Sequence, residues 1–482
     1  MTLNNNSYQH KIFFGALFML TGGLGKNIIA FGVNLILARL LTPSDFGSVA
    51  IVVSIISILK IFAELGTSVA LVQRKTITLK IKDSAFTATL VVTLTFIIIL
   101  WISANTISNY FNNKVLKDLI HIAAFSYVFL GIFSLYRSLL LRDLRYKAIS
   151  VIEFIGVIIS SVVTVSLACF NIGPSSIVWG QLASAGCLLF LGFALTRYVP
   201  KSLGDWSSLK ELFSFGIWVS LSRVLGNASG QFDKFIIGKL IDPGTLGGYY
   251  LAQKIVMILP SIFTGVIDQV MLPIYSQWQD SPSRIEKGYW KGLRISALLV
   301  LPAMALLAAI AHPLIYLLLG QAWCNIVPLI QIFCIFGAIQ GLGGGIFGSV
   351  IYASGKPQTM ILVNAFRIIM LPLCVFIGSF SGILGISYGM VAFGIIGRLF
   401  NQYILTRIFN FKFSLFFSTI ALPITINIVI YFLTIKISLL SNNLILSLFI
   451  SSLFFTLCYI VTICILFTDD FLFIKNSLLT RR

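Results

Sequence analysis

Uninterrupted apolar runs of about 20 or more residues recur along this chain, and they constrain its fold more than any other feature. Only an α-helix of that length can cross a bilayer with every backbone N–H and C=O group hydrogen-bonded within the segment. A transmembrane β-barrel would show shorter segments of alternating polarity. The sequence therefore predicts an all-α integral membrane protein.

On this length criterion we expect about 14 transmembrane helices with short connections. The low share of charged residues, 10%, excludes a water-soluble domain, which carries roughly a quarter. The expected spans are residues 12–39, 46–69, 84–107, 117–136, 149–170, 174–196, 212–238, 246–274, 292–317, 325–352, 358–379, 383–406, 413–436 and 443–467.

The net charge of +19 follows from topology rather than from a nucleic-acid partner. If the N-terminus is cytoplasmic, roughly 22 basic residues lie on the cytoplasmic side and roughly 5 on the other, as the positive-inside rule requires. No basic stripe is interleaved with aromatic residues in a polar segment, so we expect no nucleic acid to bind. The asymmetry predicts that both termini are cytoplasmic.

Two stretches 200 residues apart share one pattern, "ILARLLTPSDFGSVAI" from Ile36 and "IIGKLIDPGTLGGYYL" from Ile236. Each stretch ends one expected span and begins the next, with a proline at the helix start, where its missing N–H costs nothing. The residues that recur are Arg39, Leu40, Pro43 and Gly47 in the first copy and Lys239, Leu240, Pro243 and Gly247 in the second.

The repeat predicts the domain organisation. Six spans separate the copies, and an even number preserves orientation, so the halves should be parallel repeats. We expect an N-terminal lobe (1–200), a C-terminal lobe (201–409) and a remainder (410–482) with spans 13 and 14 and a cytoplasmic tail. The predicted fold is two parallel six-helix lobes around a central cavity, plus two extra C-terminal helices.

Polar residues share one helical face in spans 1 and 7, at spacings that the repeat aligns. Ionisable groups within a bilayer are costly and call for a function, and basic residues outnumber acidic ones inside these spans. We therefore expect the cavity to bind a polyanion. The candidate substrate-binding residues are Lys26, Asn27, Asn34, Arg223, Asn227, Lys234, Lys254 and Arg367.

Internal salt bridges or snorkelling side chains are the alternative for these cations. Asp233 stands beside Lys234, and Arg398 is expected to snorkel. Glu153 is expected to lie near a helix start, where the helix dipole favours an acidic side chain. Asp268 and Glu64 are the candidates for ion coupling, and a plain salt bridge is equally compatible with their neighbours.

No catalytic constellation stands out, and we expect the protein not to be an enzyme. The motif "GGGIFG" from Gly343 matches GxGxxG, but it lies in an apolar helix with no preceding strand, so we expect close packing or bending there. Neither the seven Cys nor the three His residues have ligand spacing, so we expect no metal and no cofactor.

Three segments resemble polysaccharide exporters of the multidrug/oligosaccharidyl-lipid/polysaccharide exporter superfamily, and the Wzx-type flippases are the most similar branch. They are "LARLLTPSDFGSVAIVVSIISILKIFAELGTSVALVQRK" from Leu37, "SLLLRDLRYKAISVIEF" from Ser138 and "FDKFIIGKLIDPGTLGGYYLAQKI" from Phe232. The resemblance covers about Phe14 to about Arg407. It is specific for the family and weak for the glycan.

The resemblance implies a flippase that moves undecaprenyl-diphosphate-linked oligosaccharide repeat units, of O-antigen or exopolysaccharide, across the bacterial inner membrane. Alternating access coupled to an ion gradient is implied, as are membrane lipids, a polysaccharide polymerase and a chain-length regulator as partners. Two alternatives stay open: an ion-coupled drug exporter of the same superfamily, and a membrane glycan polymerase.

Overall fold

The architecture is helical throughout the described part of the chain. A computed structural model describes residues 5–64, 71, 77–205, 226–227, 230–278, 281–355, 358–438 and 443–466, and no strand occurs in them. The helices are α1 (Asn5–Leu40), α2 (Pro43–Glu64), α4 (Leu79–Tyr110), α5 (Val115–Arg142), α6 (Tyr146–Cys169), α7 (Ser175–Thr196), α9 (Phe232–Leu240), α10 (Pro243–Gln277), α11 (Pro282–Ala309), α12 (Ala311–Leu319), the short 3₁₀ helix η1 (Gln321–Ile326), α13 (Val327–Gly341), α14 (Gly344–Ala353), α15 (Thr359–Ser379), α16 (Gly382–Phe409), α17 (Phe413–Ser438) and α18 (Leu444–Leu466).

Twelve helical segments in the described residues are long and apolar enough to cross a membrane. Each coincides with one of the spans expected from the sequence, so the all-α integral membrane fold is confirmed. The two remaining expected spans are residues 12–39, which lie within α1, and residues 212–238, which are described only from 226 onward. The total of 14 spans stays a prediction.

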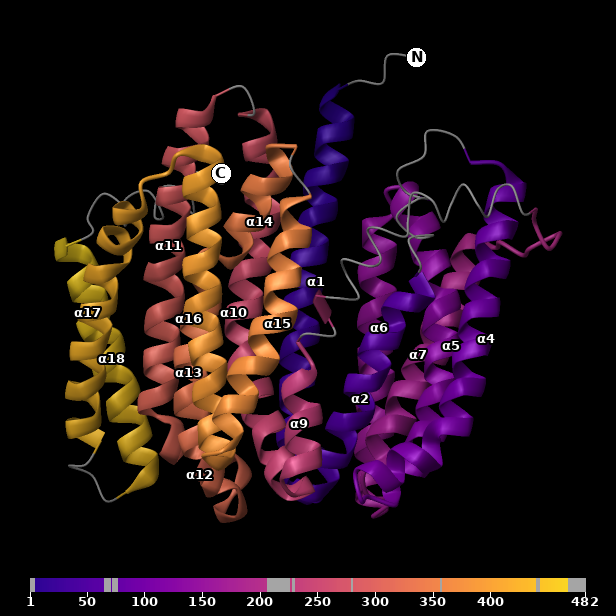
Figure 1. Ribbon diagram of the computed structural model, residues 1–482, viewed down its shortest axis with the longest axis horizontal. Coiled ribbons are helices and arrows are strands. Elements are labelled where there is room, and N and C mark those ends of the chain that lie inside the picture. Colours follow the sequence, from indigo (N-terminus) through magenta and orange to yellow (C-terminus); the bar gives the residue numbers. More distant parts are fainter. Residues whose placement is uncertain are drawn as a thin grey trace. The chain divides into compact units, whose positions relative to one another are not determined.

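The chain forms two compact units, Met1–Tyr250 with Asn364–Leu373 and Leu251–Val363 with Cys374–Arg482. In the first unit, α4, α5, α6 and α7 lie side by side as a bundle, and α1 packs along α6 (Figure 1). In the second, α17 packs against both α11 and α18. The lobe boundaries inferred from the repeat stay a prediction.

The two repeated stretches meet in the first unit, where α2 crosses the start of α10. A side chain on Gly47 would overlap the carbonyl oxygen of Pro243, and one on Gly247 would overlap the carbonyl oxygen of Pro43. The contact is reciprocal, so each copy supplies the glycine that the other copy's first helical turn requires. Glycine at both positions is what permits this close backbone approach.

The helix starts beside these glycines use one cap with its partners exchanged. At α2 the Thr42 hydroxyl accepts from the Asp45 backbone N–H (3.3 Å), and the Asp45 carboxylate accepts from the Thr42 backbone N–H (2.9 Å). At α10 the carboxylate belongs to the preceding residue, Asp242, and accepts from the Thr245 backbone N–H (2.9 Å) and hydroxyl. Threonine and aspartate have exchanged positions while satisfying the same helix ends.

The expected span 325–352 is broken in the middle. α13 ends at Gly341 and α14 begins at Gly344, because Gly343 has a φ of 67°, in the left-handed region that glycine tolerates. The glycine-rich motif therefore bends the chain, as predicted, and it does so as a complete break between two helices.

Candidate functional site

The first candidate site is built by the packing of α1 on α6. Gly22 and Gly25 leave room for this contact: a Cβ on them would lie 3.3 Å from Ser150 Cβ and 3.2 Å from the Phe154 ring. Gly22 lies one helical turn before Lys26, and Gly25 directly precedes it. The close approach of the two helices therefore brings the lysine to Glu153 on α6. The glycine-rich stretch of span 1 is thus a closely packed part of α1.

Glu153 holds two cations from two further helices. Its Oε2 lies 2.5 Å from Lys26 Nζ on α1, and its Oε1 lies 2.9 Å from Arg137 Nε on α5. The side chains of Lys26, Glu153 and Arg137 are 25%, 23% and 40% exposed, so the cluster is only partly enclosed. The expected role of Glu153, a carboxylate favoured by the helix dipole alone, is therefore incomplete.

The two asparagines of the α1 face differ in their surroundings. Asn34 is buried and its amide donates to the Ala30 carbonyl one turn earlier, so the helix itself satisfies part of this side chain. Asn27 is half-buried. Both stay candidates for substrate contact, and Asn27 is the more accessible.

Lys234 in α9 is enclosed far more tightly than Lys26. Its side chain is 7% exposed, and Nζ lies 3.4 Å from Oδ1 of the adjacent Asp233, which is fully buried. The other carboxylate oxygen accepts from the hydroxyl of buried Tyr249 on α10 (2.9 Å). This geometry favours the internal ion pair, the alternative stated from the sequence, over a substrate-binding role.

The remaining candidates have less defined surroundings. Asn227 is exposed, while Lys254 in α10 and Arg367 in α15 are half-buried. The Asn364 side chain on α15 lies against Gly226, 3.4 Å from where its Cβ would be, so the structure brings α15 to the segment that carries Asn227. Arg223 lies outside the described residues, as do the side chains of Glu64 and Asp268.

The position predicted for Arg398 is wrong. This residue was expected to snorkel, but it is 8% exposed in α16 and its Nη2 donates to the Ile339 and Gln340 carbonyls at 3.1 and 3.3 Å. These carbonyls end α13 just before the break at Gly343, where no further helical turn supplies N–H groups from which they could accept hydrogen bonds. The signal in the sequence was the glycine run itself, which frees carbonyls that a buried cation can cap.

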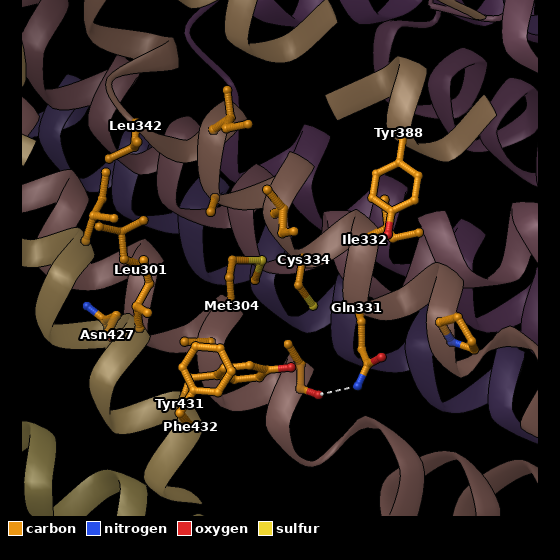
Figure 2. A pocket seen from close by; sticks show the side chains of 18 of the residues that line it. Leu301, Met304, Gln331, Ile332, Cys334, Leu342, Tyr388, Asn427, Tyr431 and Phe432 are labelled. Atoms are coloured by element: carbon orange, nitrogen blue, oxygen red, sulfur yellow. Dashed lines mark hydrogen bonds between the residues drawn. The ribbon is translucent and has the colours of Figure 1, made fainter. Parts of the chain in front are cut away.

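The second unit holds an apolar cavity of about 620 Å³ between α11, α13, α16 and α17. Figure 2 shows side chains such as Leu301, Met304 and Phe432 around it, with Tyr388 and Asn427 as polar groups at the wall. A cavity of this size and lining suits a flexible apolar ligand. α17 is one of the two helices predicted to lie outside the repeat, and it contributes to a potential binding site.

Comparisons with known proteins agree on one family. The lipopolysaccharide biosynthesis protein WzxC of Escherichia coli (strain K12) is 22% identical over 79% of this chain and 78% of its own length. The teichuronic acid biosynthesis protein TuaB of Bacillus subtilis (strain 168) is 23% identical over 76% of each.

Among solved structures, the lipid II flippase MurJ in an inward closed conformation superposes with a TM-score of 0.77 at 15% identity, covering 94% of this chain and 99% of MurJ. An inward-facing multidrug transporter of the MATE family superposes with a TM-score of 0.63 at 14% identity, over 81% of this chain and 98% of its own. The fold is therefore that of these transporters. The model of the polysaccharide biosynthesis protein family matches residues 36–328, more than half of the sequence. The chain belongs to the polysaccharide biosynthesis protein family.

Proposed function

We propose that this protein is a flippase that moves undecaprenyl-diphosphate-linked oligosaccharide repeat units, of O-antigen or exopolysaccharide, across a membrane by alternating access. Its membership of a polysaccharide biosynthesis family, in a chain made almost wholly of membrane-spanning helices, carries the proposal. Such a chain acts on the glycan while the glycan is attached to lipid.

The charged part of this substrate needs fixed positive charge inside the membrane. A diphosphate crossing a region of low dielectric is stabilised by Lys and Arg through charge-assisted hydrogen bonds. Lys26 meets this need because it is only partly enclosed. Asn27, Asn34, Asn227, Lys254, Arg223 and Arg367 are proposed as further contacts, and Lys234 takes part through the fold.

The apolar part of the substrate fits the second unit. An isoprenoid chain is long, flexible and without polar atoms, and the cavity lined by α11, α13, α16 and α17 has matching walls. We propose that part of the isoprenoid chain of the substrate enters this cavity and that the rest of the isoprenoid stays in the bilayer.

Energy for transport is proposed to come from an ion gradient, with proton or sodium binding at Asp268 or Glu64. A carboxylate whose exposure changes between two states can load an ion on one side and release it on the other. We place the protein in the bacterial inner membrane with both termini cytoplasmic, from the asymmetry of basic residues. A polysaccharide polymerase and a chain-length regulator are the proposed partners.

A drug exporter of the same fold is the competing function. A site for cationic drugs requires available carboxylates. Two described acids that lie beside candidate cations, Glu153 in α6 and Asp233 in α9, are paired with basic residues, which supports an anionic substrate.

The test is the sidedness of lipid-linked repeat units in a strain that lacks this protein. We expect the units to accumulate in the cytoplasmic leaflet and to reach the periplasmic leaflet again when the protein is restored. Normal surface glycan in the deletion strain, or repeat units that reach the periplasm without the protein, would overturn the proposal. Accumulation of flipped but unpolymerised units would point to the polymerase instead.

A further inference from the structure

The cluster of Lys26, Arg137 and Glu153 holds more positive than negative charge. Two cations share one carboxylate, and within the described residues neither cation lies within salt-bridge distance of a second one. A surplus cation in a membrane-spanning bundle costs free energy, and the binding of a second anion lowers that cost. This cluster is therefore suited to receive an anion in addition to, or in place of, Glu153.

The exposure of the cluster makes such a visit feasible. All three side chains are between 23% and 40% exposed, whereas the Lys234 side chain is 7% exposed and that of Asp233 is fully buried. Arg137 binds the carboxylate through Nε. Among the described residues no partner is seen for its two terminal nitrogens, so they are available to donate to a ligand. A guanidinium presents those donors in the fork geometry that phosphate oxygens accept.

The carboxylate also joins three helices. Glu153 belongs to α6, Lys26 to α1 and Arg137 to α5, so one side chain holds α1 and α5 to α6 at this level. An anion that takes Lys26 from Glu153 would remove this tie between α1 and α6. Binding of the anion and freedom of α1 to move would then be coupled, because the same ammonium group serves both.

We propose that Lys26 and Arg137 form a diphosphate site and that Glu153 is its resident anion, displaced from Lys26 when substrate binds. A diphosphate carries more charge and more acceptor oxygens than a carboxylate, so it competes well for both cations. The proposal rests on the proposed function for the identity of the ligand. Arg137 and Glu153 become binding and positioning residues of the transport site.

The test is a double-mutant cycle on the purified full chain in lipid nanodiscs, with inorganic pyrophosphate as the probe. Glu153→Gln removes the competitor and should tighten pyrophosphate binding by about 10-fold, while Lys26→Gln should weaken it by about 10-fold. In the Lys26→Gln background, Glu153→Gln should change affinity by less than about 2-fold. Lys117→Gln removes an exposed cation from the far end of α5 and should leave binding unchanged.

Two outcomes overturn the proposal. Pyrophosphate binding that is no tighter in Glu153→Gln shows that the carboxylate does not compete. An equal gain with and without Lys26 shows a general effect of charge. If Glu153→Gln does not fold, Arg137→Gln tests the same site: it should weaken binding, and unchanged affinity rejects the site.

Transport supplies a second readout that a merely structural pair would not change. In proteoliposomes Glu153→Gln should reach half-maximal flipping at a lower concentration of lipid-linked oligosaccharide but flip more slowly, because α1 no longer returns to α6. A variant with unchanged half-saturation argues against the exchange. If the wild-type protein moves no lipid-linked oligosaccharide, the proposed function fails, whereas the pyrophosphate cycle still reports on the site.

Discussion

Lys26 in α1 and Lys234 in α9 meet their carboxylates in different ways, although both helices lead into copies of the same repeat. Lys26 pairs with a residue of another helix and keeps 25% of its side chain exposed. Lys234 pairs with its own neighbour, Asp233, and is almost fully enclosed with Tyr249. We infer that a charge inside a membrane protein can serve either the fold or a binding site, and that the exposure of the side chain is the property that distinguishes the two.

The backbone of the repeat shows no such divergence. Gly47 and Gly247 perform the same role for each other, and the threonine–aspartate caps beside them have only exchanged positions. We infer that the junction between the copies requires symmetry because it is a close backbone contact. The charges could diverge because each depends only on its local partners.

The largest expected effect on stability comes from the enclosed pair. Asp233→Asn leaves the Lys234 ammonium without its buried carboxylate and should destabilise the protein by about 3–5 kcal/mol. The apparent melting temperature of purified protein measures this. Asp233→Asn combined with Lys234→Met should recover most of the lost stability, since neither member of the pair is then charged. A single variant as stable as wild type would remove the distinction drawn above.

Substitutions at the two junction glycines should have the next largest effect on stability, and the effect should be equal in both copies. Gly47→Val or Gly247→Val forces a side chain into a neighbouring carbonyl group and should cost about 2–3 kcal/mol. The loss of monodisperse protein on size-exclusion chromatography reports it. Gly23→Val is the matched control, because nothing lies within 4 Å of a Cβ built there. Unequal effects at the two junction glycines would contradict the inferred symmetry.

The caps should have a smaller effect that depends on pH at one copy. Burial alone would raise the pKa of Asp242, but hydrogen bonds from the Thr245 side chain and backbone N–H outweigh it and hold the pKa below its usual range. A lowered pKa means that this stabilisation is present above about pH 4 and is lost as the pH falls through the folded-state value.

Asp242→Ala should therefore cost about 1 kcal/mol at neutral pH, and its deficit against wild type should shrink on acidification below about pH 4. Thr42→Ala at the other copy should cost a similar amount at neutral pH. Asp242→Asn keeps the cap but not the charge, so its stability at neutral pH should lie between those of wild type and Asp242→Ala. A deficit that stays constant down to pH 3 would show that the carboxylate charge has no part in the cap.

The smallest effect on stability is expected at Lys26. The Lys26–Glu153 pair is partly exposed, and removing it by Lys26→Gln should cost less than about 1 kcal/mol. Surface glycan should nevertheless be lost in cells that produce the variant at normal levels. A melting temperature that falls as far as that of Asp233→Asn would mean that Lys26, too, is part of the fold.

Much of the architecture was predictable because it depends on local properties. Apolar length located twelve spans, and the recurring proline and glycine revealed the two copies, although not that the copies contact each other. The dipole interpretation of Glu153 was incomplete, because its partners Lys26 and Arg137 come from other helices and sequence does not give their register. Arg398 was misplaced for a related reason: its partners are carbonyls freed by a helix break, and the glycine run marks the break but not the side chain that reaches it.

The most direct measurement is flipping of an undecaprenyl-diphosphate oligosaccharide in proteoliposomes that contain the purified protein. We compare wild type, Lys26→Gln, and the combined variant Asp233→Asn with Lys234→Met. We expect flipping by wild type and by the combined variant, and none above protein-free vesicles by Lys26→Gln. Flipping at the wild-type rate by Lys26→Gln, or no flipping by wild type, would contradict this expectation.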